Sequence, residues 1–150
     1  MPLNQSLKGK TYQELTFEVE RDRVTQFSLA VGEDDPRFLE DGAARAEGFP
    51  EQLAFPTFPT TVGILASAQV VTDPELGLDY TRVVHGEQEF EWQRPLVVGD
   101  VLKSSPRIAD IYVKGPNEFL VIEAEITDAD GAVVCIARST LLSRGTAEGV

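Results

Sequence analysis

Hydrophobic and polar residues alternate along residues 14–20, with the period of a half-buried strand. From Arg21 the period becomes helical, and Gly32 provides a stop signal. In the second half of the chain the pattern predicts strands at 81–92, 100–113, 118–128 and 132–143. The Asp130-Gly131 pair between the last two is typical of a β-hairpin turn.

One almost entirely apolar run, residues 59–71, has the length of a helix. Pro59 suits the first turn of a helix, because its missing N–H costs nothing there. A helix that is apolar nearly all round is expected to be buried. The order of elements predicts an α+β fold, with a five-stranded antiparallel sheet wrapped on this central helix. No repeat or linker divides the chain, so we expect a single domain over residues 1–150.

The charge of the chain limits the kinds of partner that it is expected to bind. A net charge of −12, without clustered Lys or Arg, argues against nucleic acid and anionic membrane surfaces. The chain has neither an apolar run of about 18 residues nor a secretory pattern at its start, so we expect a cytoplasmic protein without a membrane segment. An anionic ligand such as a CoA ester would need a local basic patch. The candidates, which are otherwise solvated surface cations, are Lys10, Arg94, Lys103, Arg107 and Lys114.

Cysteine and histidine are too scarce for several kinds of site. The single Cys135 excludes an internal disulfide, and its apolar neighbours predict a small buried hydrophobic side chain. His85 is the only histidine, so a serine triad or a histidine-rich metal site is hard to build. Asp34 and Asp35 are adjacent at a turn, where carboxylates usually cap or face solvent. We therefore expect no metal and no cofactor.

Three segments resemble one family. Residues 32–38, Gly-Glu-Asp-Asp-Pro-Arg-Phe, resemble the Gly-Asp-x-Asn-Pro-x-His signature of MaoC-like (R)-specific enoyl-CoA hydratases. Residues 86–100 resemble that group's strand ending in Arg-Pro-x-x-x-Gly-Asp, and residues 54–58 precede the predicted helix. The pattern is most similar to the FAS1-like (MaoC N-terminal) dehydratase subgroup. That subgroup includes accessory subunits of the actinobacterial (3R)-hydroxyacyl dehydratase of mycolic acid synthesis.

The resemblance implies a hot-dog fold and a dimer, because hot-dog proteins normally join their sheets side by side. The expected assembly is a homodimer, or a heterodimer with a catalytic MaoC-like hot-dog subunit. An unpaired sheet edge, which proteins usually cover, supports the same expectation.

The chain departs from the family signature at the positions that carry the chemistry. Gly32 and Pro36 are retained, and Asp35 stands in place of the Asn. In the active enzymes the Asp and His hold the catalytic water and move protons, but here Glu33 and Phe38 replace them. Phenylalanine can neither take nor give a proton. The longer Glu33 side chain displaces its carboxylate, and a shift of about 1 Å can cost about 10²-fold in rate.

Two residues remain as candidate catalytic groups, Glu33 and His85. Alternation along strand 81–92 places His85 on the face of the exposed glutamates, opposite Gln88, Phe90 and Trp92. Phe90 and Trp92 should then face the central helix. In that position His85 is either a structural histidine or an alternative acid/base group.

The expected substrate-binding residues gather around the helix start and the inward face of strand 81–92. A buried Gln88 amide needs hydrogen-bond partners, which a thioester or pantetheine amide could supply. Free N–H groups around residues 57–61 would favour negative charge on a thioester oxygen, as the family resemblance also implies, although Thr57 or Thr60 could simply cap the helix. The acyl chain would run past two aromatic side chains. The full set is Thr57, Phe58, Thr60, Gln88 and Trp92.

Three functional hypotheses follow. The leading one is an acyl-thioester-binding subunit, for acyl-CoA or an acyl-carrier thioester, of a (3R)-3-hydroxyacyl dehydratase or enoyl hydratase that needs a catalytic partner. The second is a self-sufficient enoyl-CoA hydratase that uses Glu33 or His85. The third is a non-enzymatic acyl-binding scaffold.

Overall fold

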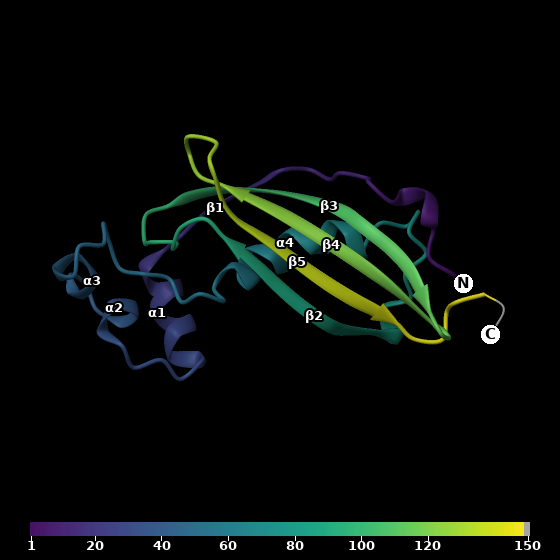
Figure 1. The fold of residues 1–150 in the computed structure, drawn as a ribbon, viewed down its shortest axis with the longest axis horizontal. Coiled ribbons are helices and arrows are strands. Elements are labelled where there is room, and N and C mark those ends of the chain that lie inside the picture. Colours follow the sequence, from purple (N-terminus) through teal and green to yellow (C-terminus); the bar gives the residue numbers. More distant parts are fainter. Residues whose placement is uncertain (149–150) are drawn as a thin grey trace.

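The computed structural model describes residues 1–148, whose main feature is one antiparallel sheet (Figure 1). Its five strands have the order β1-β3-β4-β5-β2. The predicted strands are confirmed, with shifts of a few residues at their ends. Their observed bounds are β1 Leu15–Glu18, β2 Val83–Trp92, β3 Val101–Lys114, β4 Asn117–Thr127 and β5 Val133–Ser143.

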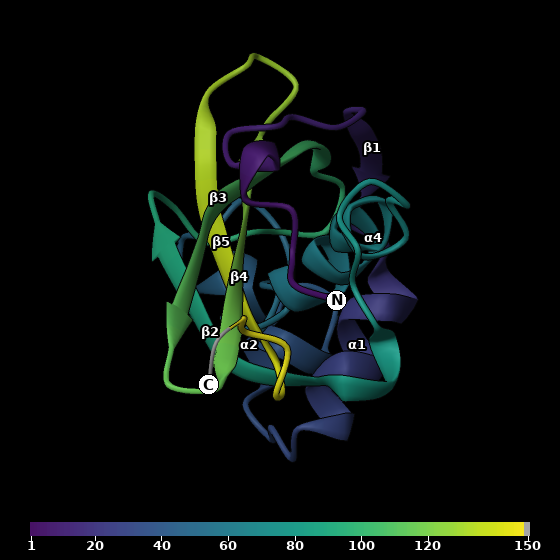
Figure 2. The ribbon, with the colours of Figure 1, turned by 90° about the vertical axis from the view of Figure 1, so that its right-hand side faces the viewer.

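The helices lie on one side of this sheet and at one end of it (Figures 1 and 2). The longest, α4, lies along the sheet, whereas the segment with α1, α2 and α3 extends beyond the sheet's end (Figure 1). The α-helices are α1 Arg21–Ala30, α2 Pro36–Leu39, α3 Ala43–Ala46 and α4 Pro59–Val71. Two short 3₁₀ turns, η1 Gln5–Leu7 and η2 Tyr80–Arg82, are the other regular elements within residues 1–148.

Helix α4 has the predicted bounds, and it buries the side that faces the sheet through Val62, Ala66 and Val70. The expectation of burial all round is wrong, because Ile64 is 65% and Leu65 52% exposed. One sheet can cover only one side of a helix. The opposite side of α4 therefore presents large apolar side chains to solvent in this chain.

The core under α4 is aromatic at its centre. Phe58 is 1% exposed and makes edge-to-face contacts with Phe17 and Phe27, with ring centroids 6.3 and 5.5 Å apart. Phe90 and Trp92 of β2 pack against the same cluster, so their predicted inward orientation is confirmed. Aromatic pairs in this geometry add to the burial of apolar area.

The turn predicted after α1 continues into a helix that the sequence pattern did not reveal. Gly32 adopts a positive φ of 80°, a conformation that glycine accepts without strain. Pro36 then begins α2, and the Asp35 side chain caps it by accepting a hydrogen bond from the Arg37 N–H at 2.9 Å. The single turn of α2 is too short to show a hydrophobic period.

A β-bulge in β2 overturns the expected orientation of His85. The pairing of β2 with β5 shifts register between His85 and Glu87. An extra residue in a strand reverses the alternation of side chains beyond it. His85 therefore lies on the same face as Gln88, and its Nε2 is 3.2 Å from Gln88 Oε1.

Candidate functional site

Two cavities are lined by five of the sequence-predicted site residues, Phe38, Thr60, His85, Gln88 and Trp92. The first, of about 350 Å³, lies where the segment with α2 and α3 meets the end of β2. Its wall is almost wholly apolar. The lining residues are Phe38, Phe49, Leu53, Ala54, Pro56, Trp92, Gln93, Arg94 and Pro95.

The residues at the family's signature positions either form part of the apolar wall of the first cavity or stabilise their own turn. Phe38 lines the first cavity and packs edge-on against Phe55 with centroids 5.7 Å apart. Glu33 is half-buried and lines neither cavity, because its Oε1 accepts hydrogen bonds from the N–H groups of Asp34 and Asp35, both at 2.9 Å. Hydrogen bonds from Arg37 lower the pKa of Asp35. No proton-transfer group from the signature therefore reaches this cavity.

The second cavity, of about 430 Å³, lies between α4, η2 and the inner face of β2 and β5. Apolar side chains form much of its wall, but a group of polar side chains faces it as well. The lining residues are Thr60, Ile64, Ser67, Ala68, Val71, Tyr80, Val83, His85, Gln88, Ser139 and Leu141.

A chain of hydrogen bonds orders the polar side of the second cavity. Gln88 and Ser139 are direct neighbours across β2 and β5, and Ser139 Oγ donates to Gln88 Oε1 at 2.7 Å. His85 Nε2 lies within hydrogen-bond distance of the same oxygen. The side-chain oxygen of Gln88 is thus occupied, while its NH₂ group has no partner among residues 1–148. That NH₂ group is available to a carbonyl oxygen of a ligand.

The sequence predicts several free N–H groups at the start of α4, but the structure shows hydrogen bonds to most of them. The N–H groups of Phe58, Thr60 and Thr61 donate to the carbonyls of Phe55, Thr57 and Phe58, at 2.8 to 3.0 Å. The tight turn before the helix consumes these donors, and neither Thr57 nor Thr60 caps it, since the N-cap is Phe58 without a side-chain bond. Within the described residues, the Thr57 N–H keeps no partner.

The expected binding residues divide between four places. Trp92 lines the first cavity, whereas Thr60 and Gln88 line the second. Thr57 is exposed at the helix start, between Pro56 of the first cavity and Thr60 of the second. Phe58 belongs to the core and lines neither cavity.

Sequence reasoning missed Ser139 and Tyr80 of the second cavity and Phe49 of the first. Ser139 reaches the site through the pairing of β2 with β5, which lie 51 residues apart at this point. No local pattern carries that information. The nearest signal was the alternation in 132–143, which predicts a strand but not its neighbour.

The candidate cations do not form a basic patch. Lys10 pairs with Asp73 and Glu75, both at 2.7 Å. Arg94 forms two hydrogen bonds to Asp100, at 2.8 and 3.0 Å. Carboxylates also pair with two further candidates: Glu123 with Arg107 at 2.7 Å, and Glu14 with Lys103 at 3.8 Å. Among residues 1–148, Lys114 has no ion pair.

Cys135 is fully buried, as predicted, and burial raises the pKa of its thiol to about 11. The thiol is therefore protonated at neutral pH, and a thiolate nucleophile is excluded.

The fold defines the class of protein. It matches the C-terminally truncated HadBC (3R-hydroxyacyl-ACP dehydratase) complex from Mycobacterium tuberculosis, with a TM-score of 0.80 and 25% identity over 91% of this chain and 96% of that one. It also matches the (R)-hydratase of A. caviae involved in PHA biosynthesis, with a TM-score of 0.71 and 16% identity over 92% of this chain and 98% of that one. The chain therefore has the expected hot-dog fold of MaoC-like dehydratases and hydratases.

The family is defined by sequence as well. The model of the FAS1-like dehydratase domain region matches residues 6–137, so the chain belongs to this family. A UPF0336 protein of Saccharopolyspora erythraea is 44% identical over 99% of this chain and 96% of its own length. A UPF0336 protein of Streptomyces coelicolor is 40% identical over 99% of both.

Some of the structural neighbours are complexes. Besides HadBC, the ChsH1-ChsH2 complex from Mycobacterium tuberculosis matches, with a TM-score of 0.71 and 12% identity over 93% of this chain and 99% of that one.

Within the described residues, no helix is both long and apolar enough to cross a membrane.

Proposed function

We propose that this chain is the acyl-thioester-binding subunit of a (3R)-3-hydroxyacyl dehydratase or enoyl hydratase, and that a partner subunit supplies the catalytic pair. One observation carries the proposal. A cavity lies beside the family signature, but Phe38 forms part of its wall and the Glu33 carboxylate is bound to its own turn. Such a site can hold an acyl group but has no acid–base pair to act on it.

The substrate would extend along both cavities. The apolar acyl tail suits the first cavity, where each buried CH₂ contributes about 0.8 kcal/mol. The polar part of the thioester suits the second, where the Gln88 NH₂ group can donate to a carbonyl oxygen. The helix start lies between them, with the unpartnered Thr57 N–H near the expected thioester.

The decisive experiment has two arms. Calorimetry measures the binding of saturated acyl-CoAs and acyl-carrier thioesters of increasing length to this chain. Hydration of crotonyl-CoA and longer enoyl-CoAs is then assayed with the chain alone, with a MaoC-like partner that has the intact signature, and with both together. The proposal expects binding by the chain alone and turnover only with the partner. Absence of binding to this chain by every thioester tested would refute it.

A second function is favoured by the position of His85. The bulge turns this histidine into a cavity with Gln88 and Ser139, where it could act as an acid/base group. Turnover by the pure chain that is lost in His85→Gln would establish this self-sufficient hydratase. Tight binding without turnover in any combination would leave the acyl-binding scaffold.

A further inference from the structure

One residue of β2 lies between the two cavities. The inward side chains of this strand follow one another in the order Gln88, Phe90 and Trp92. Gln88 lines the second cavity and Trp92 the first, whereas Phe90 lines neither. Phe90 packs instead against the core cluster that contains Phe58, and its ring centroid is 6.3 Å from that of Trp92. A ligand that extends from one cavity to the other under α4 therefore has to pass the Phe90 ring.

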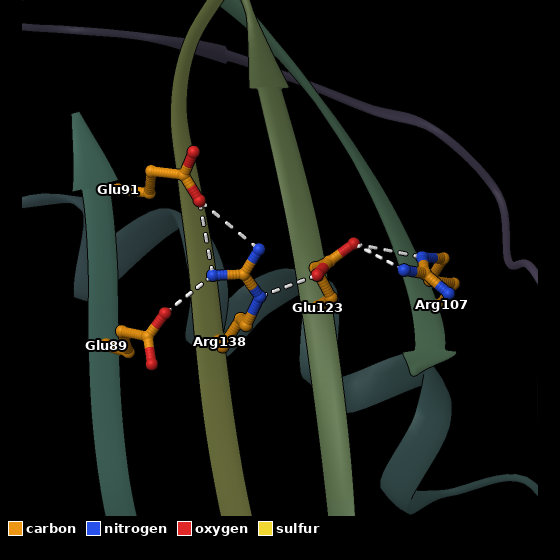
Figure 3. A network of polar contacts seen from close by, with 5 residues as sticks. All are labelled: Glu89, Glu91, Arg107, Glu123 and Arg138. Carbon is orange, nitrogen blue, oxygen red and sulfur yellow. Dashed lines mark hydrogen bonds and ion pairs between the residues drawn. The ribbon is translucent and has the colours of Figure 1, made fainter. Parts of the chain in front are cut away.

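Ion pairs hold β2 in place on both sides of Phe90. On the outer face of the strand, Arg138 of β5 binds Glu89 at 2.6 Å and Glu91 at 3.3 Å (Figure 3). The same guanidinium binds Glu123 of β4 at 2.7 Å, so it ties three strands together. Charges in a network of this kind stabilise more than isolated surface pairs do. A passage past Phe90 therefore has to open by rotation of the ring rather than by movement of the strand.

The residues beside Phe90 on the inner face of the sheet are small. Phe90 is directly opposite Ala137 of β5, and Ala137 is directly opposite Ala124 of β4. Their methyl groups fill little of the space between the sheet and α4. The room for the ring thus depends on the side chains that α4 contributes.

Helix α4 contributes a glycine on this side. Gly63 is buried, and it lies on the helix surface between Ala66, which faces the sheet, and Thr60 and Ser67, which line the second cavity. Within residues 1–148, no atom outside the helix backbone and the adjacent residues lies within 4 Å of the place that a Cβ would take. The space beside Gly63 is therefore empty, and it continues the second cavity toward the sheet.

The usual structural reasons for a buried glycine do not apply to Gly63. Its φ is not positive, and no neighbouring group comes so close that a side chain would displace it. Glycine inside a helix lowers stability relative to alanine, and protein interiors are normally filled. The chain thus keeps a destabilising residue that leaves a void, and a path for a ligand is a functional reason for such a residue.

We infer that Phe90 and Gly63 form a gate between the two cavities, and that this gate sets the length of the acyl group that the chain accepts. A short acyl group stays in the second cavity. A longer one passes the rotated Phe90 ring through the space beside Gly63 and reaches the apolar wall at Trp92. The inference rests on the proposed acyl-thioester function, to which it adds the residues that select substrate length.

Filling the space beside Gly63 should separate short from long ligands. We expect Gly63→Val to weaken the binding of dodecanoyl-CoA about tenfold in calorimetry, because the methylene groups beyond the gate lose their apolar contacts. Butyryl-CoA should bind nearly as it does to the native chain. The matched control is Ser67→Val, which narrows the second cavity one turn further along α4 and should weaken both ligands alike.

A second substitution tests whether the two residues act together. Combining Gly63→Val with Phe90→Leu, which removes the ring, should recover most of the lost dodecanoyl-CoA binding, since residues that share one space are coupled. Phe90→Leu without recovery would overturn the pairing of the two residues in one gate.

Gly63→Ala supplies a measurement that needs no ligand. Its methyl group should raise the thermal midpoint by about 2–4 °C, because alanine favours the helix and displaces nothing. It should also show the same separation of ligand lengths to a smaller degree, so the result does not depend on the folding of the valine variant. A lower midpoint would mean that the space is already filled, and would overturn the inference.

The outcomes distinguish this inference from the proposed function. Equal losses for both acyl-CoAs in Gly63→Val would overturn the gate and leave the acyl-thioester function standing. A native chain that binds neither acyl-CoA nor any other acyl thioester would overturn the function, and the gate with it.

Discussion

At the scale of single residues, the side chains at the signature positions of this chain have structural roles. Phe38 can only pack, and Glu33 accepts the N–H groups of its own turn. Asp35 is likewise committed to capping α2 and pairing with Arg37. What remains in the first cavity is an apolar surface with Trp92 at one side.

Replacing Trp92 should affect long acyl chains more than short ones. The side chain lines the apolar first cavity, where the proposed tail would lie. We expect Trp92→Ala to weaken binding of long-chain acyl-CoA about tenfold while leaving short-chain binding nearly unchanged. Calorimetry on folded variants measures this, with Trp92→Phe as the control that keeps an aromatic wall. Equal losses for both lengths would place the tail elsewhere.

Restoring the signature should restore part of the chemistry. Phe38 lines the cavity, so a histidine there would face a bound acyl group. The double variant Phe38→His with Glu33→Asp is expected to hydrate crotonyl-CoA measurably, whereas Phe38→His alone should do so less. Unchanged activity in a variant with a native circular dichroism spectrum would show that the cavity differs beyond the two missing groups.

At the scale of elements, α4 depends on an anchor at its C-terminal end. Asp73, just after the helix, accepts hydrogen bonds from Lys10 at 2.7 Å and from Tyr12 at 2.8 Å. These bonds lower the pKa of Asp73, while burial and the contact with Asp73 raise the pKa of Tyr12 to about 12. The N-terminal segment is thereby held to the end of α4.

Removing that anchor should have a pH-dependent cost. Because the folded-state pKa of Asp73 lies below the ordinary value of about 3.9, the carboxylate stabilises the fold above that pH and loses its effect as the pH falls through the folded-state pKa. We expect Asp73→Asn to lower the thermal midpoint at pH 7 by about 3–6 °C. Thermal melts across the acid range should show the difference shrinking below about pH 4. A difference that persists unchanged would contradict a role for the charge.

At the scale of the whole molecule, the net charge of −12 acts on every anionic ligand. The candidate cations, apart from Lys114, are paired with carboxylates of the same chain. Lys114 is therefore the one candidate left to offset the repulsion of a CoA ester. Under the proposed function, we therefore expect the chain to bind the acyl part of the ligand more than its phosphates.

Salt should consequently speed the binding of acyl-CoA. Screening reduces the repulsion, so we expect the association rate constant to rise about threefold between about 20 and about 300 mM NaCl. Stopped-flow fluorescence of Trp92 measures the rate, and an uncharged acyl-pantetheine is the matched control, whose rate should not change. A rate for acyl-CoA that falls with salt would reveal a local basic patch.

Much of the fold could be predicted because its causes are local. Pro59 at the first turn and an apolar run ending before Asp73-Pro74 determine the bounds of α4. Alternation and Asp130-Gly131 determine the last two strands and their hairpin. The absence of a proton donor at Phe38 is equally a property of the sequence, because no folding can give a phenyl ring a titratable group.

The site itself was decided by tertiary structure. A single extra residue in the β2–β5 register turned His85 inward, and the same pairing brought Ser139 to Gln88. The tight turn before α4 consumed N–H groups that the sequence left free, and packing buried Phe58 away from both cavities. Periodicity describes one strand or helix at a time. Which side chains share a cavity depends on register and on which face of α4 the sheet covers, and these are settled by contacts between segments far apart in the chain.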